Sequence, residues 1–325
     1  MNSILKKALF SLAIVAATSM SAQAAESLRF VSAANPSGTW YIGMGAIGKV
    51  YSTITGKEVT MLPGGGATNA PRLASRAADV GVAENSILNA FKVGSEPYKQ
   101  PTSKGVASII NLQDRINYQI ASPKASPVNK LEDLKTMKNL TIGVGSTGGS
   151  TEKIFRNIIK GYGISYDDIR GNGGKIVFNS FDDIANMAKD GQMDVFVWIG
   201  PGEAWFITDV SGSVPLKFLS IKDDVAKTVA EKLGNNVGTL PAQFYKGAVG
   251  ENVTTLWDTN AIIVRDDLDE DSAYMLTKAI CEGKADIALA NPSWKAIDPA
   301  TGWKNNKFPL HSGAEKYYKE HGYMK

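Results

Sequence analysis

The chain has 325 residues and a formal net charge of +3 at pH 7, from 35 lysines and arginines against 32 aspartates and glutamates. No stripe of basic residues stands out, which argues against a nucleic-acid partner. Two histidines and one cysteine are too few for a metal cluster or a Ser-His-Asp triad. We therefore expect no metal, no cofactor and no catalytic residue of these kinds.

The first 24 residues have the pattern of a secretory signal peptide. A short basic segment precedes an apolar run over 8–17, and Ala22-Gln23-Ala24 forms a small-any-small cleavage site. A membrane anchor is the alternative, but the run is too short to span a bilayer comfortably. We expect cleavage after Ala24 and export of residues 25–325. Because Cys281 is the only cysteine, packing rather than a disulfide must hold the exported fold.

Short apolar strands alternate with helices along the chain in two series. The first series is predicted as strand 28–34, helix 39–55, strand 58–64, helix 67–77, strand 79–85 and extended segments 106–112 and 116–122. The second is predicted as strand 140–146, helix 151–163, strand 175–181, helix 182–191 and strand 194–200. Such alternation is typical of parallel sheets wound with helices, the α/β class.

The two series resemble each other, which predicts two similar lobes. In each, a helix runs into a strand through an aspartate, Asp79 or Asp194, for which a strand-entry role is expected rather than ligand contact. Two long extended stretches, 106–123 and 253–268, are predicted to cross between the lobes and form a hinge. The predicted domains are lobe 1, residues 25–118 with 258–325, and lobe 2, residues 119–257.

Four strand-to-helix turns are rich in glycine: 35–41, 63–70, 145–151 and 200–205. A helix N-terminus exposes unpaired N–H groups and attracts anions. In open α/β sheets, ligands lie beyond the carboxyl ends of the strands, where such turns fall. A small carboxylate held by Ser146, Thr147, Ser150 or nearby N–H groups fits this chemistry. For each of these residues alone, capping of a helix is the alternative.

The segment 143–148 also spells the G-x-G-x-x-G of a dinucleotide-binding turn. The acidic residue expected at the end of the next strand is missing, because that strand ends in Asn179 and Ser180. The same spelling recurs at 43–48, inside a predicted helix. Dinucleotide binding is therefore not expected. Four aromatic residues beside the turns could wall a cleft, with ordinary packing as the alternative: Trp40, Tyr41, Trp198 and Trp205.

Four segments resemble motifs of one transport family: "GTWYIGMGAIGKV", "GGATNAPRLASRAADVGVAENS", "VNKLEDLKTMKNLTIGVGSTGGSTE" and the ending "FPLHSGAEKYYKEHG". Together they make the chain similar to the periplasmic receptors of TRAP transporters of the TAXI type. The resemblance implies a type II periplasmic-binding fold, with two doubly wound α/β lobes and a two-segment hinge around a central cleft. It implies no catalysis, a periplasmic location and a membrane permease, driven by an ion gradient, as partner.

The resemblance also implies ligand contacts. They fall on Thr39, Tyr41, Thr68, Asn69, Glu84, Ser146, Thr147, Gly148, Ser150 and Trp198. The expected ligand is a small carboxylate or amino acid, such as glutamate or 2-oxoglutarate. His311, in the ending motif, is expected to anchor the tail.

The chain departs from the family pattern at several positions. Ile42 and Gly43 replace a proline and a leucine, and Glu84 stands where the family tends to have glutamine. A carboxylate there repels a simple anion, so Glu84 faces an ammonium group, is protonated, or points away. Arg115, in the first crossing stretch, is a candidate carboxylate clamp, with a surface salt bridge to Asp114 or another acid as the alternative.

Two other functions stay open at this point. An exported enzyme on the same fold would need an acid or base in the cleft, and Glu84 is the candidate. A sensor or adhesion module would instead depend on a protein partner and bind no small ligand.

Overall fold

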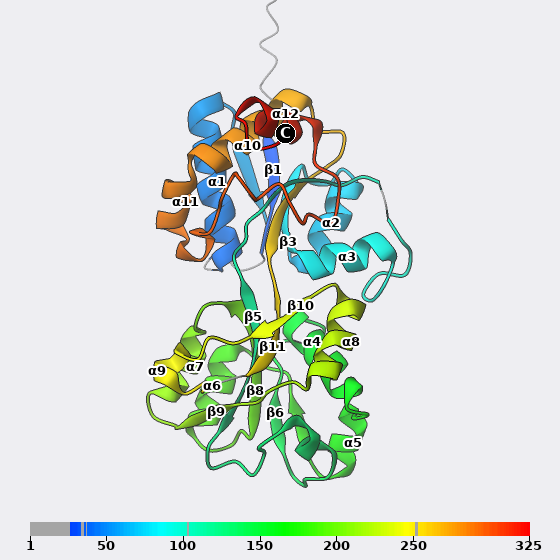
Figure 1. Ribbon diagram of the computed structural model, residues 1–325, viewed down its shortest axis with the longest axis vertical. Coiled ribbons are helices and arrows are strands. Elements are labelled where there is room, and N and C mark those ends of the chain that lie inside the picture. The colour runs from blue at the N-terminus through cyan, green and yellow to red at the C-terminus, as the bar shows by residue number, and fades with distance from the viewer. Residues whose placement is uncertain (1–26, 34–35, 37, 103, 251–252) are drawn as a thin grey trace, which may run out of the picture.

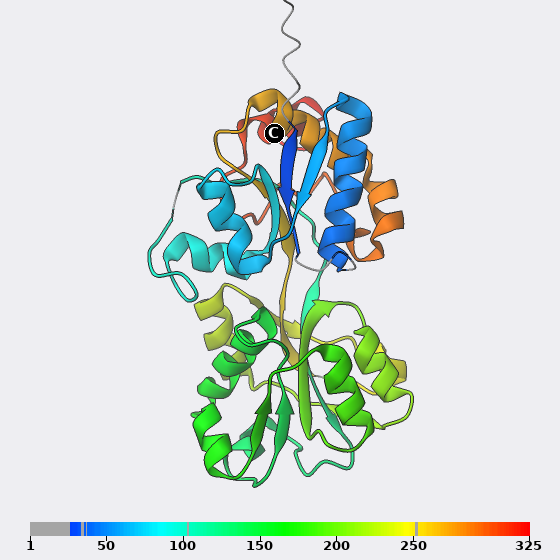
Figure 2. The same ribbon diagram turned by 180° about the vertical axis from the view of Figure 1, so that it is seen from behind.

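A computed structural model describes residues 27–33, 36, 38–102, 104–250 and 253–325 (Figure 1). The predicted signal peptide lies outside these residues. Two α/β lobes stand one above the other and are joined by extended segments (Figures 1 and 2). The α/β class and the two-lobed arrangement predicted from the sequence are confirmed.

Lobe 1 is built on a five-stranded sheet of order β2-β1-β3-β12-β4, in which β1 is parallel to both of its neighbours and β12 is antiparallel to both of its own. The strands are β1 Leu28–Val31, β2 Val59–Leu62, β3 Val80–Glu84, β4 Ala107–Asn111 and β12 Asn260–Val264. The helices are α1 Thr39–Thr55, α2 Gly66–Ala74, α3 Asn85–Val93, α10 Glu270–Glu282, α11 Lys284–Ala290 and α12 Ser312–Glu320, with the 3₁₀ turn η2 Pro292–Trp294.

Lobe 2 is built on a second sheet of order β10-β11-β5-β8-β6-β7, with β9 paired to β5. The strands are β5 Ile116–Pro123, β6 Thr141–Gly143, β7 Lys175–Val177, β8 Val195–Pro201, β9 Leu216–Phe218, β10 Asn236–Thr239 and β11 Thr254–Asp258. The helices are α4 Ser150–Gly161, α5 Tyr166–Gly171, α6 Phe181–Lys189, α7 Trp205–Ser211, α8 Asp223–Leu233 and α9 Phe244–Gly247, with the 3₁₀ turn η1 Leu131–Lys135.

The two sheets share one core topology. In lobe 1, β2-β1-β3 run parallel and β12 is antiparallel to β3; in lobe 2, β7-β6-β8 run parallel and β5 is antiparallel to β8. The similarity predicted between the two series is therefore a repeat of strand order and direction. In parallel strands followed by helices, the carboxyl ends lie at one edge of the sheet, and in both lobes that edge faces the gap between them (Figure 2).

Each lobe has its own apolar core. Helix α1 buries Met44, Ile47 and Tyr51 against the first sheet, and α4 buries Ile154, Phe155, Ile158 and Ile159 against the second. The departure at Gly43 has a packing reason, because a Cβ at that position would lie 2.3 Å from the ring of Trp294. Cys281 is buried in the first core, where burial raises the pKa of its thiol to about 12.

The strand-entry role expected for the two aspartates is confirmed. Asp79 accepts a 2.8 Å hydrogen bond from the backbone N–H of Arg29 in β1, and Asp194 accepts a 2.8 Å bond from the N–H of Thr141 in β6. Each carboxylate thus ties the start of one strand, β3 or β8, to the parallel strand beside it, β1 or β6.

His311 anchors the tail, as expected. Its ring Nδ1 accepts a hydrogen bond from Gly313 N–H and caps α12. The backbone N–H of His311 donates to the carbonyl of Ser108 in β4. Gly313 lets α12 approach α10, since a Cβ there would lie 2.2 Å from the Glu270 carbonyl oxygen.

Two segments carry the chain between the lobes within the described residues: 112–115, from β4 to β5, and Thr259, from β11 to β12. They are bonded to each other, because Leu112 N–H donates to the Asn260 carbonyl and Asn260 N–H donates to Asp114. The domain boundaries after residues 118 and 257 stay predictions, and β5 pairs with lobe 2 from Ile116. Among the described residues, no helix is long and apolar enough to cross a membrane.

Candidate functional site

Several of the turns at the gap lead into helices that begin without a side-chain cap. The residues before α1, α2 and α4 are Gly38, Gly65 and Gly149, which have no side chain to accept the first N–H groups. Helices α5 and α6, by contrast, are capped by Ser165 and Ser180. Because α1 and α2 belong to lobe 1 and α4 to lobe 2, free N–H groups and positive helix ends from both lobes lie at the gap. This favours anion binding there over the capping alternative.

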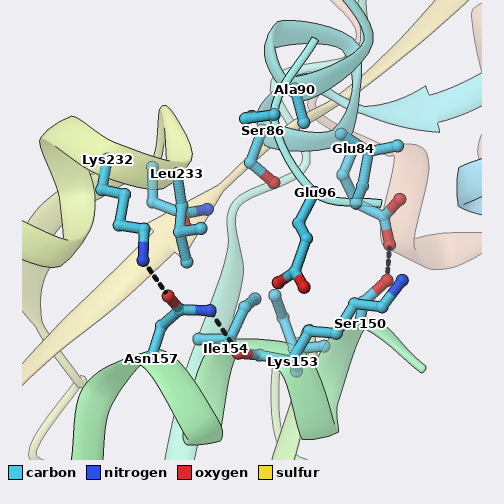
Figure 3. Close-up of a pocket in the computed structure, with 14 residues that line it drawn as sticks. Glu84, Ser86, Ala90, Glu96, Ser150, Lys153, Ile154, Asn157, Lys232 and Leu233 are labelled. Atoms are coloured by element: carbon cyan, nitrogen blue, oxygen red, sulfur yellow. Dashed lines mark hydrogen bonds between the residues drawn. The ribbon is translucent and has the colours of Figure 1, made fainter. Parts of the chain in front are cut away.

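Glu84 and Ser150 join the two lobes. Glu84 ends β3, Ser150 begins α4, and the serine hydroxyl lies 3.5 Å from Glu84 Oε1 (Figure 3). The other oxygen, Oε2, is buried and has no hydrogen-bond partner among the residues that the structure describes. It lies against Gly66 at the start of α2, where a Cβ would be 2.5 Å from Oε2 and 3.5 Å from the ring of Trp40. The carboxylate is therefore held between the starting residues of two helices from different lobes.

The pKa of Glu84 is raised to about 7, mainly by burial and to a lesser extent by the negative charges of Asp258 and Asp114. A backbone hydrogen bond and the Ser150 hydroxyl oppose this rise. Asp114 and Asp258 lie in the hinge and are themselves buried. Burial raises the pKa of Asp114 to about 7 and that of Asp258 to about 6. The site thus holds a carboxyl group that exchanges a proton near neutral pH.

A cavity of about 60 Å³ lies beside Glu84, between the lobes (Figure 3). We call it the interlobe cavity. Lobe 1 contributes Glu84, Ser86, Ile87, Ala90, Ser95 and Glu96, and lobe 2 contributes Ser150, Lys153, Ile154, Asn157, Ile199, Lys232, Leu233 and Asn235. It has room for about two water molecules, which suits one small polar group of a ligand and not a whole amino acid.

The walls of the interlobe cavity carry opposite charges. The acidic groups, Glu84 and Glu96, come from lobe 1, and the basic groups, Lys153 and Lys232, come from lobe 2. Lys232 donates a 2.8 Å hydrogen bond to Asn157 Oδ1, and Figure 3 shows Glu96 pointing into the space between Glu84 and Asn157. The cavity lining thus combines acidic groups of one lobe with basic groups of the other.

Sequence analysis missed the residues of this wall other than Glu84 and Ser150. A signal was present, because Ser150, Lys153 and Asn157 recur at the spacing of one helix face. Glu96 and Lys232 carry no comparable signal.

The other expected contacts of lobe 1 differ in exposure. Thr39 and Thr68 are exposed, and Tyr41 is half-buried near the start of α1. The Thr68 hydroxyl donates to the Gly65 carbonyl, 3.1 Å away, so it sits at the start of α2. Asn69 is fully buried and both of its N–H donors are used, on the carbonyls of Ser32 and Val82, while Oδ1 accepts from Gly65 N–H. Asn69 therefore shapes the turn, and any effect on a ligand would be indirect.

In lobe 2, Ser146, Thr147 and Gly148 are exposed in the turn before α4. Trp198 packs edge-on against Phe181, with ring centroids 4.7 Å apart, and its Nε1 is buried without a partner. Trp205, by comparison, is 56% exposed at the start of α7. Trp198 thus belongs to the aromatic edge of the lobe 2 core, and the exposed turn supplies the free donors.

Arg115 lies away from this group. It donates to Asn117 Oδ1 at 2.9 Å and to the Thr239 carbonyl at 2.7 Å, and it lines a different cavity. The structure therefore brings together Glu84, Ser150 and the starts of α2 and α4, and it does not bring Arg115 to them.

Two doubly wound α/β lobes with a two-segment hinge and a cavity between them define the type II periplasmic-binding fold. A family model described as NMT1-like matches residues 31–322, and the chain belongs to this family.

Several solved structures are similar to this chain at low sequence identity. MatC from Rhodopseudomonas palustris, solved with bound malate, is 14% identical over 91% of this chain and 96% of that chain, with a TM-score of 0.51. Lactococcal OpuAC with glycine betaine is 17% identical over 92% and 100% of the two chains, with a TM-score of 0.49. A TRAP periplasmic solute-binding protein from Sulfitobacter sp. NAS-14.1 with bound β-D-galacturonate is 11% identical over 92% and 94%, with a TM-score of 0.44. The similarity to MatC supports the fold.

Proposed function

We propose that this protein is a solute receptor of the periplasm, and not an enzyme, that captures a small carboxylate between its lobes. It delivers this ligand to a TRAP permease of the TAXI type, driven by an ion gradient. The observation that carries the proposal is the meeting of two uncapped helix starts, α2 from lobe 1 and α4 from lobe 2, at one place. Such N–H groups neutralise a carboxylate.

Glu84 narrows the ligand class to amino acids. Its Oε2 is buried without a donor, and a second acid, Glu96, lines the same small cavity. A buried acceptor without a partner is costly, and an ammonium group in the cavity would supply both a donor and a positive charge. An α-amino acid such as glutamate carries this ammonium together with a carboxylate for the helix starts. 2-Oxoglutarate lacks it and is the weaker candidate.

The proposed direct contacts are the exposed or half-buried groups at the helix starts together with the groups of the interlobe cavity. They are Thr39, Tyr41, Thr68, Glu84, Glu96, Ser146, Thr147, Gly148 and Ser150. Asn69 and Trp198 hold these groups in position without contacting the ligand.

Calorimetric titration of the chain from residue 25 with glutamate, 2-oxoglutarate and succinate tests the proposal. We expect glutamate to bind most tightly, with a dissociation constant well below about 1 mM. Glu84→Gln should weaken glutamate and strengthen 2-oxoglutarate, because it removes the negative charge and keeps the shape. The matched control is Glu231→Gln, at an exposed position on α8. The proposal is wrong if none of the three compounds binds below about 1 mM.

One observation favours the enzymatic alternative. A carboxyl group whose pKa is raised to about 7 is suited to general acid–base catalysis. In a receptor, the same group would only match the ligand's charge. Recovery of glutamate unchanged after long incubation, followed by NMR, supports the receptor, and turnover that Glu84→Gln abolishes supports the enzyme.

A further inference from the structure

A second cavity, of about 680 Å³, lies at the hinge. We call it the hinge cavity. It shares no lining residue with the interlobe cavity and draws on both lobes and on both crossing segments. The residues that line it are Asn85, Asn111, Gln113, Arg115, Asn236, Trp257, Asp258, Thr259, Thr301, Lys304, Asn305, Asn306 and Lys307. Strands β10 and β11, which form its lobe 2 side, face the viewer in Figure 1.

The lining is positively charged. Arg115 lies in the crossing segment 112–115 and is bonded to β5 and β10 of lobe 2, and Lys304 and Lys307 come from the segment before α12. Within the described parts of the chain, none of the three forms an ion pair with a carboxylate within 4.0 Å. Lys92 adds a fourth cationic group nearby, because it donates a 2.9 Å hydrogen bond to the Lys307 carbonyl.

One acid in the lining, Asp258, offsets part of these charges. Asp258 is 1% exposed, and its oxygens accept hydrogen bonds from the backbone N–H groups of Ser86 and Thr259, both at 2.8 Å. Its carboxylate is therefore committed to the hinge backbone. Burial raises its pKa to about 6, and the positive charge of Lys307 opposes that rise, so the group is mostly ionised at neutral pH. One buried negative charge thus faces three positive charges in the lining.

Arg115 is held in a fixed orientation. Its guanidinium lies over the Trp257 ring, 5.2 Å from the centroid, and is bonded to Asn117 and to the Thr239 carbonyl. Partial burial lowers the pKa of Arg115 from its ordinary value. A guanidinium fixed by stacking and hydrogen bonds binds a carboxylate or phosphate with little loss of entropy.

Amide groups supply the remaining polar contacts. Asn85 is 3% exposed, and its Nδ2 bonds to the carbonyl and hydroxyl of Thr259, but its Oδ1 is buried without a partner. Asn306 likewise has an unpartnered Oδ1. These acceptors suit hydroxyl groups, so the cavity combines cationic groups with acceptors for O–H donors.

We propose that the hinge cavity binds a small organic polyanion that also carries a hydroxyl group, bridging Arg115, which is bonded to lobe 2, with Lys304 and Lys307 of lobe 1. An anion that bridges the lobes here ties them in the described arrangement. It therefore opposes any rotation about the hinge that moves these groups apart. Where capture of a ligand between the lobes requires such a rotation, the bound polyanion raises the dissociation constant of that ligand. By linkage, the captured ligand raises the dissociation constant of the polyanion by the same factor.

Calorimetric titration with citrate, which has three carboxylates and one hydroxyl, tests the site on the chain from residue 25 without other ligands. Inorganic phosphate and succinate are the comparison probes. We expect citrate to bind best, and the double variant Lys304→Gln/Lys307→Gln to weaken it by roughly tenfold or more. The matched control, Lys284→Gln/Lys295→Gln, removes two exposed charges from the same lobe outside the cavity and should leave citrate binding unchanged.

Further variants separate this site from the interlobe cavity. Arg115→Lys keeps the charge and loses the two-pronged geometry, so it should weaken citrate less than Arg115→Gln. Ser150→Ala should leave citrate binding intact. The inference is overturned if citrate shows no saturable binding, if the control double variant loses as much affinity as the cavity variant, or if Ser150→Ala alone abolishes binding.

The coupling between the sites rests on the proposed function and has its own readout. Citrate should raise the apparent dissociation constant of glutamate in the unaltered chain and not in Lys304→Gln/Lys307→Gln. If glutamate never binds but citrate binds as described, the proposed function fails and the hinge site stands. If glutamate binds and citrate does not, the reverse holds.

Discussion

The two lobes repeat one strand topology but tie it together with different charges. Asp79 in lobe 1 pairs with Arg29 at 2.9 Å and with Arg265 at 3.3 Å. Asp194, at the matching position of lobe 2, has no cation among its hydrogen-bond partners in the described residues and lies 3.3 Å from the Ser126 hydroxyl. In both lobes the aspartate accepts a hydrogen bond from a backbone N–H of the neighbouring strand, β1 or β6. The topology therefore requires the carboxylate acceptor, and the ion pair is an addition of lobe 1.

The lobes also build their ligand-facing turns differently. The lobe 1 turn is pinned from inside by the buried amide of Asn69. The lobe 2 turn instead has left-handed glycines, Gly145 and Gly148, and exposed hydroxyls at Ser146 and Thr147. Lobe 1 thus offers a rigid acidic wall, while lobe 2 offers accessible donors.

The largest expected effect tests the rigid wall. Asn69→Ala leaves the Ser32 and Val82 carbonyls and the Gly65 N–H without their partner, and it opens a cavity. We expect a loss of about 2–4 kcal/mol in the free energy of unfolding, measured by urea denaturation. Asn186→Ala, at an exposed position on α6 of lobe 2, should change stability by less than about 0.5 kcal/mol. Equal effects of the two variants would mean that the lobe 1 turn is not specially pinned.

The second prediction concerns how the free energy of unfolding depends on pH. It assigns part of this dependence to lobe 1, because Glu84 belongs to that lobe. The pKa of Glu84 is raised from 4.5 to about 7, so between these values the folded chain binds more protons than the unfolded chain. Stability should therefore fall as pH rises from about 4.5 to about 7, by on the order of 2 kcal/mol from Glu84. Asp114 and Asp258 act in the same direction.

Glu84→Gln should flatten this dependence in denaturation curves recorded from pH 5 to pH 8. Glu231→Gln should leave it unchanged. A chain that is more stable at pH 8 than at pH 5, with and without Glu84, would contradict the assignment of a raised pKa.

The third prediction compares the two strand-entry aspartates. Asp79→Asn removes the attraction to two arginines, whereas Asp194→Asn removes none, and asparagine can still accept the backbone N–H in both. We expect Asp79→Asn to lower the free energy of unfolding by about 1–2 kcal/mol. This loss is smaller than that for a fully buried ion pair, because Arg29 is partly exposed. Asp194→Asn should cost less than half as much in the same denaturation experiment. A larger loss at Asp194 would reverse the comparison.

The smallest expected effect is on binding. Thr68→Ala in lobe 1 and Ser146→Ala in lobe 2 each remove one hydroxyl from a turn at the gap. If both lobes hold the ligand, each variant should weaken glutamate by roughly 1 kcal/mol in calorimetric titration. Thr228→Ala, at an exposed position on α8, serves as control. If only one of the two variants loses affinity for glutamate, the ligand contacts the lobe of that variant alone.

The sequence by itself determined the alternation of strands and helices, the repeat of two lobes and the strand-entry role of Asp79 and Asp194. These features follow from local periodicity, turn chemistry and the order of elements, which are encoded by neighbours in the chain. The chemistry of Glu84 was also readable, since a carboxylate at an anion site demands a compensating group.

Only the tertiary structure decided which of these residues meet. Glu84 and Ser150 are 66 positions apart and come from different lobes, and Glu96, Lys153 and Lys232 join them only because the hinge brings α3, α4 and α8 together. Arg115 carries the right chemistry for a clamp, yet its bonds to Asn117 and to the Thr239 carbonyl hold it at a different cavity. The reason is that contacts across a hinge depend on the relative placement of two separately folded cores, which no local pattern records.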